Sequence, residues 1–229
     1  MLNLQTKPIS EITRFTTLDF PDRLSCIVWF SGCQMRCPYC YNPQMVLEDG
    51  KISLEELFKF LNSRKGKLDG VVLSGGESTL FPQIELLCKE IKDMGFEVKI
   101  DTNGLMPQRV KSLVKKGLVD FISLDFKAPK EKFNIITKTN GYEKLQETLA
   151  FLIENEFKFE VRTTVHPDLL NEDDINQIIS TLHSFGYKGR YALQKYLHVT
   201  PTLGDTKEPK NHFDIKKLNN IFDIEFRNF

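Results

Sequence analysis

The chain has 229 residues, of which 41% are hydrophobic and 27% are charged, proportions typical of a soluble globular protein. It carries 31 basic and 31 acidic residues, and this balance gives no general attraction to nucleic acid or to a membrane surface. No apolar run approaches the ~20 residues that cross a bilayer, and the polar first ten residues lack the apolar core of a signal peptide. We therefore expect a cytoplasmic protein with no nucleic-acid or membrane partner.

Predicted strands and helices alternate through the first half of the chain. Short apolar runs predict four strands, over residues 26–30, 70–73, 96–100 and 118–124. A capping box at Ser53 and Glu56 begins a helix after the first of these strands. A second helix is predicted from Pro82 to Gly95 and a third over residues 107–116.

The same alternation continues in the second half. A helix is predicted over residues 142–155, a strand over 157–165, a helix that begins after Asn171, and a sixth strand over 191–197. The tail over 200–229 is rich in Pro, Lys, Asn and Asp and has only a weak apolar periodicity. We interpret it as a docking helix or a partner-dependent segment.

Strands that are separated by helices indicate a parallel sheet with right-handed crossovers. Six strand–helix units fit an incomplete barrel better than the eight units of a closed one. The sequence therefore predicts an α/β fold, a partial (β/α)6 barrel with parallel strands. We expect one domain over residues 1–229, with its core at about 15–199 and a C-terminal tail at 200–229.

Three cysteines, Cys33, Cys37 and Cys40, form a CxxxCxxC run just after the first predicted strand. Such close spacing suits one small metal centre, and three thiolates leave one iron of an iron–sulfur cubane without a protein ligand. The alternative is a zinc site, which needs a fourth ligand that no nearby histidine offers. Cys26 lies inside the predicted strand, and Cys88 falls in an apolar helix stripe.

Polar motifs follow three more of the predicted strands. They are Ser74-Gly75-Gly76-Glu77, Asp101-Thr102-Asn103-Gly104 and Asp125-Phe126-Lys127. Parallel sheets place their functional sites at the carboxyl ends of strands, although glycine, aspartate and asparagine are also common turn formers there. Arg162 and Thr164 share one face of the fifth strand, which is either part of the same site or a solvated strand end.

These motifs occur together with the block Leu18-Asp19-Phe20-Pro21-Asp22-Arg23 and with Tyr41-Asn42-Pro43 after the third cysteine. In this order, from about residue 18 to residue 128, they resemble the radical S-adenosylmethionine (SAM) superfamily. Within it they are similar to the glycyl-radical-enzyme activases, in the branch that serves anaerobic ribonucleoside-triphosphate reductase. The resemblance implies a barrel of the radical SAM type.

The resemblance also implies the cofactors: one [4Fe–4S] cluster on Cys33, Cys37 and Cys40, whose open iron chelates SAM. A monovalent cation is expected near Asp101 and Asp125, and Lys127 is expected to face the substrate peptide. The residues expected to bind SAM and its surroundings are Tyr39, Ser74, Gly75, Gly76, Glu77, Asp101, Asn103, Asp125, Arg162 and Thr164.

The implied function is an oxidoreductase that cleaves SAM reductively and generates a glycyl radical on a partner enzyme. The expected partner is anaerobic ribonucleoside-triphosphate reductase, and the expected electron donor is flavodoxin or ferredoxin. The chain has no second ferredoxin-like cysteine set, which excludes activases with extra clusters. The alternatives are a radical SAM enzyme that acts on a different peptide or a small molecule, and a zinc-containing binding module without enzymatic activity.

Overall fold

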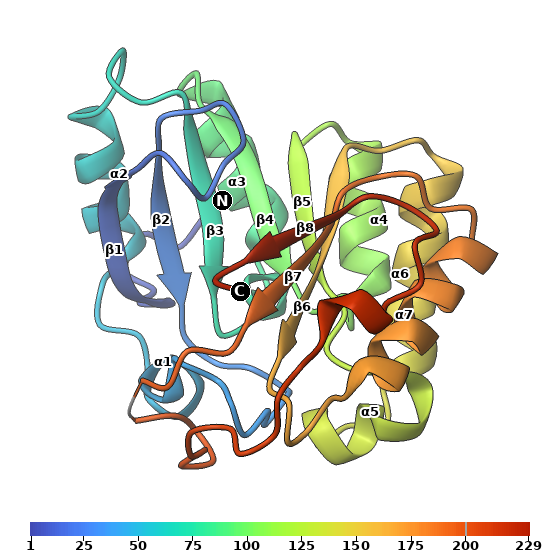
Figure 1. Cartoon of the computed structure of the whole chain (residues 1–229). Coiled ribbons are helices and arrows are strands. Elements are labelled where there is room, and N and C mark those ends of the chain that lie inside the picture. Colours follow the sequence, from blue (N-terminus) through green and yellow to red (C-terminus); the bar gives the residue numbers. More distant parts are fainter. Residues whose placement is uncertain (200) are drawn as a thin grey trace. The chain divides into compact units, whose positions relative to one another are not determined.

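A computed structural model of the chain describes residues 1–199 and 201–229 (Figure 1). The chain divides into two compact units. The first comprises Met1–Gln34, Gln44–Thr102 and Gln108–Ile122, and the second Met35–Pro43, Asn103–Pro107 and Ser123–Phe229. The expectation of one domain over residues 1–229 stays a prediction.

Parallel strands form the centre of the first unit. Its strands are β1 (Ile9–Thr16), β2 (Ser25–Phe30), β3 (Gly70–Gly75), β4 (Glu97–Thr102) and the start of β5 (Phe121–Asp125). β2, β3 and β4 are parallel neighbours, whereas β1 pairs antiparallel with β2. The backbone of Asp120, just before β5, donates to Val98 O on β4 (2.8 Å).

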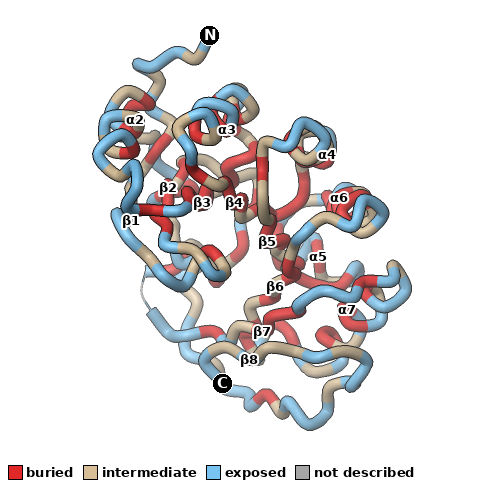
Figure 2. The backbone as a smooth tube through the Cα atoms, turned by 90° about the horizontal axis from the view of Figure 1, so that it is seen from above, coloured by how far each residue is buried: buried red, intermediate tan, exposed pale blue. Residues whose placement is uncertain are grey.

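Helices connect successive strands of this sheet along the chain. They are α1 (Pro43–Leu47), α2 (Leu54–Asn62), the 3₁₀ turn η1 (Ser78–Leu80), α3 (Ile84–Asp93) and α4 (Pro107–Lys115). Figure 2 shows the buried residues on β2 to β4 and on the inner sides of α2 and α3. The predicted capping box begins α2, because Glu56 accepts from the Ser53 backbone (2.8 Å) and donates its own amide to Ser53 Oγ (3.2 Å).

The second unit continues the alternation of strands and helices. Its elements are α5 (Lys130–Thr137), α6 (Tyr142–Glu154), β6 (Phe159–Val165), α7 (Glu172–Ser184), β7 (Tyr191–Lys195), the 3₁₀ turn η2 (Ile215–Lys217) and β8 (Ile224–Arg227). β6, β7 and β8 are parallel, and the end of β5 joins β6, where Phe126 N donates to Arg162 O (2.8 Å).

The six strands predicted from the sequence are β2 to β7, and the prediction missed β1, β8 and the short helices α1 and α5. The two outer strands lie largely outside the expected core of 15–199. Register shifts interrupt the pairing of β1 with β2, and such bulges remove the alternation that marks a strand. The docking helix predicted for the tail is wrong for the described residues, because β8 pairs there with β7. Thr200, which begins the predicted tail, lies outside the described residues.

The block over residues 18–23 connects β1 to β2. Phe20 is buried in it and packs with Ile27 and Val72, while Leu18 is exposed. Through Phe20, this block therefore contributes to the hydrophobic core of the first unit. In the described parts of the chain, no helix is both long and apolar enough to cross a membrane.

Candidate functional site

The glycine pair of the first unit lets two backbone segments meet. A Cβ on Gly76 would lie 2.1 Å from Gly32 O, and Gly75 has φ +114° with Phe30 N 2.3 Å from its ideal Cβ. Gly76 N donates to Phe30 O and Glu77 N to Gly32 O, each at 2.8 Å. Only glycine fits so close an approach, so this loop fixes the backbone that leads into Cys33.

Glu77 follows the glycines and is almost fully buried, with 2% of its surface exposed. Its Oε1 accepts from Thr102 Oγ1 (2.8 Å) at the end of β4 and from the backbone of Thr79 (3.2 Å). The carboxylate therefore caps η1 and ties the end of β3 to the end of β4.

Asp101 lies near the end of β4 and has partners on both carboxylate oxygens. Ser74 Oγ donates to its Oδ2 (2.9 Å), and the ammonium of Lys99 forms an ion pair with its Oδ1. Lys99 is only 1% exposed. Ser74 and Asp101, both predicted site residues, are thus brought together in the first unit, and Lys99 joins them.

Cys37, Tyr39 and Cys40 belong to the second unit, where they form a tight turn. Cys40 N donates to Cys37 O (3.1 Å), and the buried Tyr39 donates its hydroxyl to Lys127 O (3.3 Å). Burial raises the pKa of the Cys37 thiol to about 11, while the nearby Lys127 ammonium opposes that rise. A positive charge near this thiol suits a thiolate ligand.

A charge network extends this turn across the second unit. Asp125 accepts from Lys127 Nζ (3.1 Å) and from Arg162 Nε (3.0 Å), so two cations share one carboxylate. Desolvation lowers the pKa of Lys127, but Asp125 and Cys37 outweigh it and hold that pKa above its ordinary value. Lys127 is therefore a fixed positive charge beside the cysteine turn.

Thr164 and Asn103 also lie in the second unit. Thr164 stands two residues after Arg162 on β6, as the sequence predicted, and both side chains are partly exposed while Thr163 between them is buried. Asn103 is buried, and its Oδ1 accepts from Leu105 N (3.1 Å). This hydrogen bond is typical of an asparagine that forms a turn, which is the alternative to a SAM contact.

A segment over residues 201–213, which we call the C-terminal strap, is hydrogen-bonded to the cysteine turn. Leu203 N donates to Cys40 O (3.0 Å) and Gly204 N to Pro38 O (2.8 Å). Asp168 anchors the other end, where it accepts from the backbones of Lys210 (3.0 Å) and Asn211 (2.8 Å). The sequence analysis missed this contact because nothing local marks the tail as a partner of the cysteines.

His166 lies just before the strap anchor and is buried. Its Nδ1 accepts from Asp168 N (3.3 Å), so its Nε2 is the donor toward Lys207 O (3.0 Å) on the strap. Both ring nitrogens thus have backbone partners, which gives this histidine a structural role.

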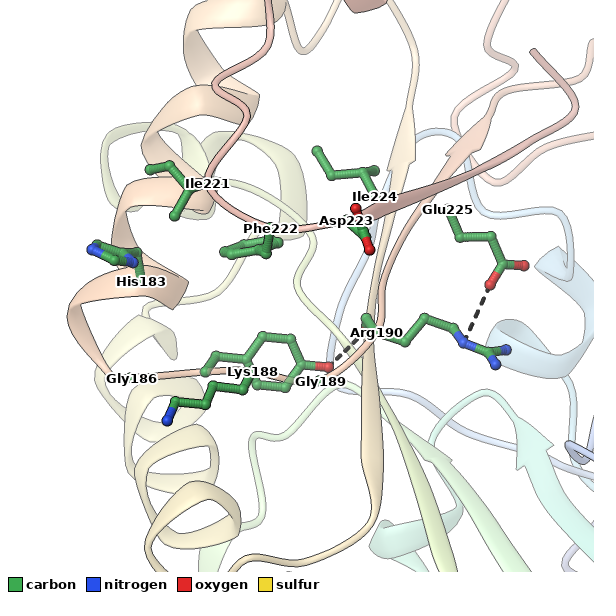
Figure 3. Close-up of a pocket in the computed structure, with 11 residues that line it drawn as sticks. His183, Gly186, Lys188, Gly189, Arg190, Ile221, Phe222, Asp223, Ile224 and Glu225 are labelled. Carbon is green, nitrogen blue, oxygen red and sulfur yellow. Dashed lines mark hydrogen bonds and ion pairs between the residues drawn. The ribbon is translucent and has the colours of Figure 1, made fainter.

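A hollow of about 960 Å³ lies at the amino ends of β7 and β8 (Figure 3). Tyr187 donates its hydroxyl to Arg190 O (2.6 Å) there, and Arg190 Nε lies 3.4 Å from Glu225 Oε2. None of the predicted site residues lines it. Because the motifs follow the carboxyl ends of strands, this hollow is not the candidate site.

Cys33 belongs to the first unit and Cys37 and Cys40 to the second. Among residues 1–199 and 201–229, no group of three or more His, Cys, Asp or Glu is arranged to hold a metal ion. No cysteine of the chain is in a disulfide, so all three thiols of the motif have the right chemistry for iron. The ligand set, the SAM contacts and the cation stay predictions.

The family model of the radical SAM superfamily matches residues 27–182 of the chain. A protein of Methanocaldococcus jannaschii, provisionally named a glycyl-radical enzyme activating enzyme, is 32% identical over 219 residues, which cover 92% of this chain and 85% of that protein. The chain belongs to the radical SAM superfamily. It is also 29% identical over 199 residues to the pyruvate formate-lyase-activating enzyme of Clostridium pasteurianum, across 83% of this chain and 81% of that protein.

Solved structures show the same fold. SuiB of Streptococcus suis has a TM-score of 0.67 at 16% identity, across 86% of this chain and 47% of that one. Its complex with S-adenosylmethionine has a TM-score of 0.66 at 14% identity, across 88% and 52%. The chain therefore spans about half the length of these solved proteins, and the expected α/β partial barrel is confirmed.

Membership of this superfamily makes the chain a radical SAM enzyme and implies a [4Fe–4S] cluster and SAM as its cofactors. It favours the iron–sulfur interpretation of the cysteines over a zinc-binding module. Lys99 is the site residue that the sequence analysis missed. The sequence could have indicated it, because Lys99 interrupts an apolar predicted strand two residues before Asp101 and therefore lies on the same face of that strand.

Proposed function

We propose that this chain is a glycyl-radical-enzyme activase whose partner is anaerobic ribonucleoside-triphosphate reductase. The observation that carries the activase assignment is the match to an activase relative over 92% of this chain and 85% of the relative. The choice of reductase depends on the motif resemblance and on the absence of a second ferredoxin-like cysteine set from the sequence.

Cys33, Cys37 and Cys40 are the proposed ligands of the [4Fe–4S] cluster. When bound, the cluster supplies the electron for reductive cleavage of SAM, which yields methionine and the 5′-deoxyadenosyl radical that takes a hydrogen atom from the partner's glycine. The residues of this chain hold the reactants in place. Lys127 is a fixed cation beside Cys37, and it favours the anionic form of that thiol.

The remaining site residues are proposed to bind and orient SAM. Arg162 offers a guanidinium for the carboxylate of SAM, and Asp125 keeps that guanidinium in place through its ion pair. Tyr39 presents a buried aromatic ring in the cysteine turn, suited to packing against the adenine. Ser74 and Asp101, which are hydrogen-bonded to each other, offer acceptors for the amino group of SAM.

The electron donor is proposed to be flavodoxin or ferredoxin. The test is an anaerobic assay with reconstituted protein, SAM, a chemical reductant and the reductase, read by electron paramagnetic resonance. We expect a glycyl radical on the reductase and none with the Cys37→Ala variant. Pyruvate formate-lyase in place of the reductase serves as the partner control.

Each outcome decides one part of the proposal. A radical on pyruvate formate-lyase alone would keep the activase assignment and replace the partner. Steady SAM cleavage with no radical on either enzyme would favour the second function, a radical SAM enzyme that acts on a different peptide or a small molecule. No SAM cleavage by an iron-loaded protein would contradict the proposal as a whole.

A further inference from the structure

Lys99 places an ammonium group inside the sheet of the first unit. It lies on β4 opposite Val72 of β3, in the parallel register of these strands, and is 1% exposed. Val72 packs with Ile27 and Phe20, so the face on which Lys99 lies is apolar at this level. A lysine in such a place needs an anionic partner, because an isolated buried charge is strongly destabilising.

That partner is Asp101, two residues further along β4 and therefore on the same face. The Lys99 ammonium is bound at Oδ1 and the Ser74 hydroxyl at Oδ2 (2.9 Å). A positive charge thus already lies against the carboxylate at which the resemblance places a monovalent cation. A further cation at Oδ1 would have to displace the ammonium or stand beside a like charge.

Asp125, the other aspartate of the expected cation site, shows the same arrangement inside the second unit. Lys127 Nζ and Arg162 Nε bind its two oxygens at 3.1 and 3.0 Å. Each aspartate therefore has a cationic side chain of its own unit as counter-ion. Lys99 differs from Lys127 in being almost completely buried, so water has little access to the ammonium that faces Asp101.

We propose that the Lys99 ammonium is a built-in counter-cation of Asp101, so that this enzyme requires no potassium or sodium ion at that carboxylate. Lys99 acts through Asp101 and is a positioning residue. The inference depends on the proposed function in one respect, namely that Asp101 lies near bound SAM. The ion pair itself is independent of the substrate and can be tested in the protein without its cluster.

The first experiment measures thermal unfolding of the cluster-free protein in potassium, sodium and tetramethylammonium chloride at equal ionic strength. The wild-type midpoint should be the same in all three salts. Lys99→Met keeps most of the side-chain volume but leaves the Asp101 carboxylate without its ammonium. Its midpoint should be lower, and should rise with potassium or sodium but not with the bulky tetramethylammonium ion.

Lys92→Met is the matched control, because Lys92 forms a lysine–aspartate pair with Asp120 in the same unit (2.6 Å) but is 28% exposed. Water can replace its ammonium, so this variant should show no preference among the three salts. If Lys99→Met does not fold, the double variant Lys99→Met/Asp101→Asn removes both charges. It should fold, with a midpoint that is independent of the cation.

The second experiment measures 5′-deoxyadenosine formation by the iron-loaded protein, without any partner enzyme, in the same salts. The wild-type rate should not depend on the cation. Lys99→Met should lose at least about tenfold in tetramethylammonium chloride and recover in potassium or sodium chloride. This assay does not involve glycyl radical formation, so a wrong partner assignment leaves its result unchanged.

Two results would overturn the inference. One is a wild-type enzyme that loses activity or thermal stability when potassium and sodium are removed, since an added cation would then act beside Lys99. The other is a folded Lys99→Met variant with no salt preference in either experiment, since Lys99 would then not take the place of a cation.

Discussion

Glu77, Asn103 and Tyr39 each serve the local structure while standing in a motif that marks chemistry. Glu77 caps η1, Asn103 closes a turn, and the Tyr39 hydroxyl reaches the backbone of Lys127. Their substitution should therefore disturb the position of neighbouring groups as well as any contact with SAM. The cysteines are better single-residue tests.

Cys37→Ala should abolish iron and sulfide incorporation and SAM cleavage while the fold is retained, because a [4Fe–4S] cluster would keep only two of its three proposed thiolates. Iron and sulfide per chain, with circular dichroism for the fold, measure the effect. Cys88→Ala is the control, since that buried thiol lies in α3 outside the motif and should keep full iron content. Normal iron and activity in Cys37→Ala would refute the ligand assignment.

Burial raises the pKa of Cys26 and of Cys88 to about 12, from an ordinary value of 9.0. Between these two values the unfolded chain loses the thiol protons that the folded chain keeps. The free energy of unfolding should therefore fall as the pH rises from about 9 towards 12. Urea unfolding of the cluster-free protein at several pH values measures this decline.

The slope of that decline should be smaller in Cys88→Ala, by up to about one proton per molecule. Cys40→Ala serves as the control, because it removes a thiol that is partly exposed rather than buried. An unchanged slope in Cys88→Ala would show that the buried thiol does not contribute.

At the scale of elements, the C-terminal strap is held chiefly by hydrogen bonds between backbone groups and a few side chains. Its contacts with Pro38 and Cys40 fix the two carbonyls on either side of Tyr39. The strap thereby limits how far the cysteine turn can move. Asp168 is the anchor that a single substitution can remove.

Asp168→Ala should loosen the strap, because the amides of Lys210 and Asn211 lose their acceptor. We expect faster proteolysis within residues 201–213 of the cluster-free protein and faster alkylation of Cys40, both followed by mass spectrometry. Asp205→Asn is the control, since its carboxylate pairs only with the exposed Lys207 in the described part of the strap. Equal rates in Asp168→Ala and the wild type would contradict this role.

Hydrogen bonds from the backbones of Lys210 and Asn211 lower the pKa of Asp168 below its ordinary 3.8. The contribution of this anchor is therefore complete above that pH and is lost as the pH falls further. Cleavage of the strap by pepsin should accordingly increase as the pH is lowered below 3.8 in the wild type, and much less in Asp168→Ala.

At the scale of the whole molecule, a buried ion pair joins the end of the chain to the middle of the sequence. Arg227 on β8 donates to Glu160 on β6 (3.0 Å), and Ser123 Oγ donates to the same carboxylate (2.7 Å). The Glu160 side chain is 5% exposed. The tail is thus a structural part of the second unit.

Arg227→Met should lower the free energy of unfolding by about 3 kcal/mol, because the buried carboxylate loses its charged partner. Urea unfolding measures the loss. The double variant Glu160→Gln/Arg227→Met removes both charges and should recover part of it. A single variant as stable as the wild type would show that water or Ser123 suffices for Glu160.

The six strands β2 to β7, the α2 capping box and the strand-end motifs could be read from the sequence. These features depend on residues that are close neighbours in the chain. β1 and β8 could not, because one is interrupted by bulges and the other is only four residues long. Their strand character comes from their partners in the sheet rather than from their own pattern.

The sequence by itself determined the class of chemistry, because the cysteine run and the order of the motifs resemble the radical SAM superfamily, and the strand–helix alternation predicts a partial barrel. Only the tertiary structure decided which charges neutralise one another. Lys99 with Asp101, Lys127 and Arg162 with Asp125, and Arg227 with Glu160 are pairs set by strand register and burial. A buried charge needs a partner nearby in space, and nearness in space is a property that folding creates.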